Sequence, residues 1–83
     1  MDAEVRDDPR ILFGLRLREL RRARSLSQEE LAARSGLHTT YLSGIERGHR
    51  NVSLLNIYRL ADALAVNPEE LFHPSASPQA EQT

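Results

Sequence analysis

The chain has 83 residues, no cysteine and a formal net charge of −1, and 40% of its residues are hydrophobic. These values predict one small domain with a modest core, and they exclude a disulfide framework and cysteine-ligated zinc. No apolar run approaches the roughly 20 residues of a membrane span, and the acidic start of the chain lacks the apolar region of a signal peptide, so we expect a cytoplasmic protein with no membrane partner.

The first predicted helix covers residues 9–24 and follows an acidic, flexible start over residues 1–8. Asp8 and Pro9 suit the N-cap and the first helical position, where proline loses no hydrogen bond. The side chains expected on one face of this helix recur at helical spacing, namely Phe13, Leu17, Leu20 and Arg24.

Two short helices are predicted next, over residues 28–35 and 39–47. Ser27 and Glu30 have the spacing of a capping box at the start of the first. Gly36 is the left-handed residue that ends it. His38 takes the N-cap position of the second, where a shorter polar residue would cap better.

A fourth helix is predicted over residues 54–65, capped by Ser53. A short fifth helix is predicted through Phe72, with Asn67 as its cap and Pro68 at its first helical position. The apolar face expected on the fourth helix consists of Leu54, Ile57, Leu60, Ala61 and Leu64. Residues 74–83 are polar and of low complexity, so we expect a disordered tail. The sequence thus predicts an all-α domain of five helices over residues 9–73.

The second and third helices, with the short glycine-bearing turn between them, have the layout of a DNA-binding helix-turn-helix. Leu42 and Ile45 would hold the third helix against the body of the domain. Thr39, Thr40 and Ser43 would face outward near its start, where this motif contacts base edges in the major groove. An ordinary solvated helix face is the alternative interpretation of these three residues.

The chain resembles the Cro/C1-type helix-turn-helix family of prokaryotic regulators, also called the Xre family, over residues 13–72. The matching segments are Arg18–Arg21, Leu26–Ala32, Gly36, Tyr41–Gly48, Leu60–Leu64 and Glu70–Phe72. The resemblance implies a compact fold like that of lambda repressor. Within the family, the segment from Thr40 to Asn51 is similar to the small controller proteins of restriction–modification systems.

The resemblance also implies roles for individual residues. The residues expected to contact phosphates are Gln28, Arg47, Arg50 and Asn51, and Tyr41 would brace a phosphate or stack on the DNA backbone. Bases would be contacted by His38, Thr39, Thr40 and Ser43, although His38 also suits a surface cap. Arg21 and Glu46 match an internal ion pair. The candidates for a homodimer interface are Leu55, Tyr58, Val66, Leu71 and Phe72.

The charge distribution is compatible with double-stranded DNA as a partner. Residues 9–73 contain ten arginines and seven acids, whereas the remaining residues contain one arginine and five acids. The near-neutral total also suits a protein-interaction module that retains the fold but has lost DNA binding, and an antitoxin is a further DNA-binding alternative. No nucleophile motif, metal-ligand set or phosphate-binding glycine loop predicts an enzyme or a cofactor. A pocket of about 300 Å³ or more would be hard to build in this chain, so no small-molecule ligand is expected.

Overall fold

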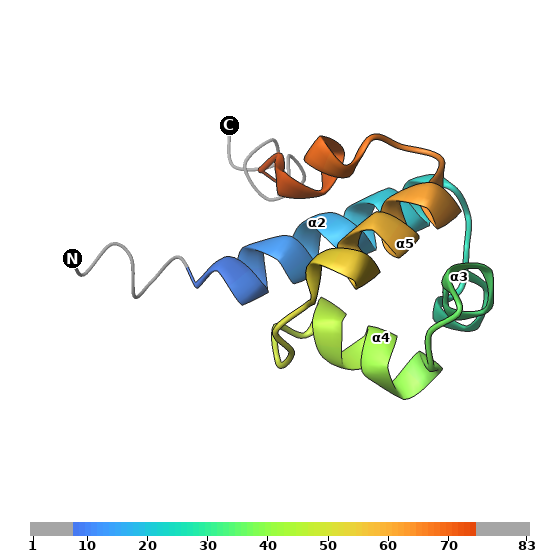
Figure 1. The fold of residues 1–83 in the computed structure, drawn as a ribbon, viewed down its shortest axis with the longest axis horizontal. Coiled ribbons are helices and arrows are strands. Elements are labelled where there is room, and N and C mark those ends of the chain that lie inside the picture. Colours follow the sequence, from blue (N-terminus) through green and yellow to red (C-terminus); the bar gives the residue numbers. More distant parts are fainter. Residues whose placement is uncertain (1–7, 75–83) are drawn as a thin grey trace.

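Four α-helices and one 3-10 helix form the computed structural model, which describes residues 8–74 (Figure 1). The elements are α2 (Pro9–Ala23), α3 (Gln28–Ser35), α4 (Thr39–Glu46), α5 (Leu54–Leu64) and the 3-10 helix η1 (Pro68–Phe72). The predicted all-α class is confirmed. The predicted flexible start and tail lie outside the described residues, apart from Asp8 and Pro74. No helix in the described range is long and apolar enough to cross a membrane.

The predicted helix starts and stops are present as hydrogen bonds. Ser27 Oγ accepts from the backbone N–H of Glu30 at 3.0 Å, and Glu30 Oε1 accepts from the backbone N–H of Ser27 at 2.8 Å. Gly36 ends α3 with a φ of 74°, a left-handed conformation that suits glycine. Asp8 caps α2 and Ser53 caps α5 through their side chains, whereas His38 makes no side-chain cap bond.

The fifth predicted helix is a single 3-10 segment rather than an α-helix. The backbone N–H of Glu70 donates to the carbonyl of Asn67 at 2.9 Å, which is the three-residue spacing of a 3-10 turn. Asn67 stands at the N-cap position but makes no side-chain cap bond, contrary to prediction. Five residues with a proline at the start offer too few backbone bonds to sustain an α-helix.

The elements pack in a closed ring of contacts. Helix α2 packs on α4 and η1, α5 packs on α3 and η1, and α3 packs on α4. In Figure 1, α4 lies along the lower edge of the molecule and η1 along the upper edge. The fully buried side chains that fill the ring are Leu17, Leu31, Leu42, Ile45, Leu60, Leu64 and Leu71.

Two residues of the predicted apolar faces are on the surface instead. Leu54 is 71% exposed because it is the first residue of α5, where the helix has only begun to cross the core. Arg24 is exposed at the C-cap of α2, one residue beyond the helix. Helix periodicity correctly predicts the apolar face in the middle of these two helices, but it fails to predict burial at their ends.

Helices α2 and α4 approach each other backbone to backbone at Gly14. A Cβ atom at this position would clash with the carbonyl oxygen of Ile45 and lie 2.7 Å from that of Glu46. Gly14 is itself buried. Because residue 14 has no side chain, the backbone of α2 can approach the end of α4 this closely.

Candidate nucleic-acid interface

Helix α4 presents an apolar face inward and short polar side chains outward. Leu42 and Ile45 are 0% and 1% exposed, whereas Thr40 is exposed and Thr39 and Ser43 are half-buried. The turn before α4 is fixed by the Leu37 N–H, which donates to the carbonyl of Ala32 at 2.9 Å. The outward residues lie in the first turns of α4, so this end of the helix is the one available to the major groove of DNA.

A buried ion pair ties the end of α4 to α2. Arg21 Nε and Nη2 donate to the two carboxylate oxygens of Glu46 at 2.6 and 3.0 Å, and Arg21 Nη1 donates to the carbonyl of Leu26 at 2.8 Å. The two side chains are 9% and 3% exposed. The hydrogen bond to Glu46 raises the pKa of Arg21. Because this planar, bidentate geometry fixes direction as well as distance, it orients α4 relative to the rest of the domain.

Gln28 belongs to the same network. Its Nε2 donates to Glu46 Oε1 at 3.0 Å, from the first residue of α3. One amide hydrogen is thereby directed into the protein, and the side chain is half-buried. A phosphate contact from Gln28 would use the other amide hydrogen or the backbone N–H at the start of α3.

Arg50 lies across α4 at Gly44. A Cβ atom at Gly44 would stand 3.0 Å from Arg50 Cγ and 3.1 Å from Arg50 Nε, so the arginine side chain fills the place of the missing side chain. The Arg50 guanidinium carbon is 5.8 Å from the centre of the Tyr41 ring. Gly44 therefore makes room for the Arg50 side chain.

The other predicted contact residues flank this arrangement. Arg47 Nη1 donates to Ser43 Oγ, which links the C-cap of α4 to its preceding turn. Arg47, Arg50 and Asn51 are all exposed. The predicted phosphate ligands thus surround the end of α4, while the predicted base-contacting residues lie nearer its start.

Two further contacts that involve α5 and η1 were also not predicted from the sequence. Asn56 Nδ2, on α5, donates to the hydroxyl oxygen of Tyr41 at 3.2 Å. Arg16 donates to the carbonyl of Glu70 at 2.8 Å and pairs with the Glu70 carboxylate at 3.1 Å, which fastens η1 to α2. The sequence shows each residue only as a polar side chain on a helix face, and neither partner stands at helical spacing from it.

The predicted dimer residues differ in their accessibility. Leu55, Tyr58 and Phe72 are 61%, 52% and 62% exposed, and Val66 is half-buried. Leu71 is fully buried within the single chain, so it is a core residue and has no exposed surface for a partner. In η1 the adjacent Phe72 turns outward, with its ring 5.6 Å from that of Phe13.

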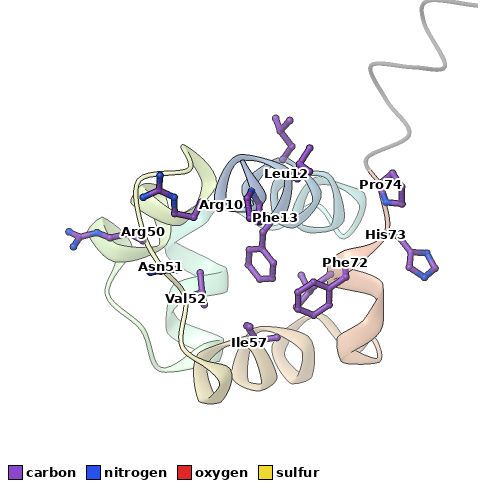
Figure 2. A pocket seen from close by; sticks show the side chains of 13 residues that line it. Arg10, Leu12, Phe13, Arg50, Asn51, Val52, Ile57, Phe72, His73 and Pro74 are labelled. Atoms are coloured by element: carbon purple, nitrogen blue, oxygen red, sulfur yellow. The ribbon is translucent and has the colours of Figure 1, made fainter. Parts of the chain in front are cut away.

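An apolar groove lies between α2, the loop after α4, the start of α5 and η1. Its volume is about 460 Å³, larger than the sequence predicted for a domain of this size. Phe13, Val52, Ile57 and Phe72 point toward it from four different segments (Figure 2). The expectation that a pocket of this size would be hard to build is therefore wrong, since residues of α2, α5, η1 and the loop after α4 enclose one.

Comparisons with known proteins agree with this geometry. The pattern of the helix-turn-helix family matches residues 17–71. The control protein C.BamHI of Bacillus amyloliquefaciens is 52% identical over 63 residues, which are 75% of this chain and 78% of that protein.

Two solved structures are similar over most of the chain. The restriction–modification controller protein C.AhdI from Aeromonas hydrophila has a TM-score of 0.76 and 59% identity, covering 77% of this chain and 97% of that one. The controller protein C.Esp1396I, solved as a tetramer with its natural 35 base-pair operator, has a TM-score of 0.71 and 30% identity, covering 76% and 83%.

Proposed function

Because the chain belongs to the Cro/C1-type helix-turn-helix family, we propose that it is a transcription regulator that binds double-stranded DNA sequence-specifically. A dimer would place two copies of α4 in successive major grooves, about 34 Å apart. It would therefore recognise a short pseudo-palindromic operator. The protein acts by binding rather than by catalysis, in the cytoplasm and on the nucleoid.

The observation that carries this proposal is the orientation of α4. Its inner face is buried on Leu42 and Ile45, its end is held by the Arg21–Glu46 pair, and its outward residues are short hydrogen-bonding side chains. Such a helix enters a major groove of about 12 Å without bulky obstruction. Phosphate contacts from Arg47, Arg50 and Asn51 would set the register, and Thr39, Thr40 and Ser43 would discriminate bases.

The sharpest form of the proposal is a controller of a restriction–modification system. It is supported by the similarity to C.BamHI and C.AhdI, both of which are covered over most of their length. Thr39, the first residue of α4, carries only a short hydroxyl side chain. Base discrimination by this protein would then depend more on the arginines that follow α4 and on DNA shape.

Selection of duplexes from a random library at about 150 mM salt, a concentration at which phosphate contacts alone bind weakly, tests the function. We expect a two-fold-symmetric motif with half-sites about ten base pairs apart. Affinity for that motif should fall with salt at a log–log slope near −7, the value for about eight neutralised phosphates. A folded protein that selects no motif and shows no salt dependence would be a protein-interaction module instead.

A further inference from the structure

Asn56 lies on α5, outside the helix-turn-helix, yet it contacts a predicted DNA-binding side chain. We propose that Asn56 is a positioning residue for Tyr41 and, through Tyr41, for Arg50. The proposal rests on the proposed function, because it concerns how the DNA-contacting side chains are held ready before DNA arrives. Asn56 itself need not touch DNA.

The position of Asn56 is fixed by the start of α5. Its backbone N–H donates to the Ser53 hydroxyl at 3.1 Å, which is the cap bond of the helix. The side chain is half-buried, and its Nδ2 donates to the Tyr41 hydroxyl oxygen at 3.2 Å. This bond joins residues 15 apart in sequence and on different helices, so it holds Tyr41 relative to the frame of the domain.

The direction of this bond matters for the tyrosine. A phenol both donates and accepts, and here its oxygen accepts from the amide. The hydroxyl proton of Tyr41 is thereby left to donate, and a phosphate oxygen is a suitable acceptor. The ring is packed against the hydrophobic core, so the hydroxyl has a fixed place.

The fixed ring in turn restricts Arg50. The guanidinium lies 5.8 Å from the ring centre, within cation–π distance, and the side chain occupies the space over Gly44. No carboxylate among residues 8–74 pairs with Arg50, so its N–H groups remain available to a phosphate. Confining this long side chain before binding reduces the entropy lost when it is ordered on DNA.

The test is the affinity of the full chain for the duplex selected above, measured with the variant Asn56→Ala. We expect binding about tenfold weaker, because Tyr41 and Arg50 must then be ordered on binding. The salt slope should stay unchanged, since every phosphate contact is still made in the complex. A variant at another asparagine, Asn67→Ala, is the control, because Asn67 is exposed and makes no side-chain cap bond.

A double-variant cycle separates positioning from a loss of stability. In a Tyr41→Phe background no hydroxyl accepts from Asn56, so Asn56→Ala should cause no further loss of affinity. A tenfold loss that persists in that background would overturn the proposal, as would wild-type affinity in Asn56→Ala with only a lower Tm. If the wild-type protein binds no duplex, the proposed function fails as well, and that outcome is visible before any variant is made.

Discussion

Arg21 and Glu46 form a bidentate pair in the interior of the domain, with Nε to Oε2 at 2.6 Å and Nη2 to Oε1 at 3.0 Å. The pair connects the end of α2 to the end of α4, and Gln28 extends it to the start of α3. Residues from three helices thus share one carboxylate, which α4 supplies and which residues of α2 and α3 contact. The helix-turn-helix is held in its orientation by this carboxylate as well as by the apolar contacts of α4.

Removing one partner of this pair should therefore strongly destabilise the folded domain. Arg21→Met strands the Glu46 carboxylate and should lower the free energy of unfolding by about 3–5 kcal/mol, measured by urea denaturation. The double variant Arg21→Met, Glu46→Leu should recover much of that loss because no charge remains buried. Arg22→Met, on the exposed neighbour, is the control and should change stability by less than about 0.5 kcal/mol. A mild effect of Arg21→Met would mean that water reaches the pair.

Gly14→Ala tests the close approach of α2 and α4. Within a helix, alanine is favoured over glycine by about 0.5–1 kcal/mol, so an uncrowded site would gain stability. Here the new methyl group would meet the carbonyls of Ile45 and Glu46, and we expect a net loss of about 1–3 kcal/mol by thermal denaturation. The exposed substitution Arg18→Ala is the control on the same helix. A more stable Gly14→Ala protein would show that the helices can separate without cost.

Local signals explain which parts of the fold were predictable. The capping box of Ser27 and Glu30 and the left-handed Gly36 are each encoded within four residues, and the structure confirms them. The α-helical form of the last element was wrong because its stability depends on α2 and α5 rather than on its own five residues. Leu71 and Phe72 are adjacent and both apolar, so only the packing decides that the first is buried and the second exposed.

The candidate site was also predictable only where local sequence signals determine it. The polar residues of α4 follow from helix periodicity, whereas the Arg21–Glu46 pairing came from a family resemblance. The contact from Arg16 to Glu70 spans 54 residues, and no periodic pattern connects them. The role of Gly44 also depended on Arg50, a residue of the following loop that no helical spacing relates to it.

Leu55→Glu should convert the proposed dimer into monomers in sedimentation experiments. Leu55 is 61% exposed on α5, so the substitution costs the folded monomer little but places two charges in the proposed interface. Leu12→Glu is the matched control, because Leu12 is 50% exposed on α2 and is not among the predicted interface residues. Monomers in the control with dimers in Leu55→Glu would move the interface to α2.

The capping box predicts an acid-dependent loss of stability. The backbone N–H of Ser27 donates to the Glu30 carboxylate and lowers its pKa. A lowered folded pKa means that the contribution is complete above the ordinary glutamate pKa of about 4.3. It is lost as the pH falls through the lower folded value. Glu30→Gln keeps an acceptor without titrating, so its Tm should fall less than that of wild type between about pH 5 and 3. Glu69→Gln, at an exposed glutamate of η1, is the control and should follow wild type.

The division between phosphate and base contacts is tested by comparing Arg50→Ala with Thr40→Ala. Losing a phosphate contact should weaken binding to all sequences alike and flatten the salt slope by about one per contact. Thr40→Ala should keep the slope and relax the preference at one base position of each half-site by about 1 kcal/mol. Arg34→Ala is the control for lost charge, because Arg34 lies at the opposite end of α3 from Gln28 and is exposed. If Arg50→Ala changed the selected sequence as Thr40→Ala does, Arg50 would be a base-contacting residue, and the discrimination expected of α4 would extend into the loop that follows it.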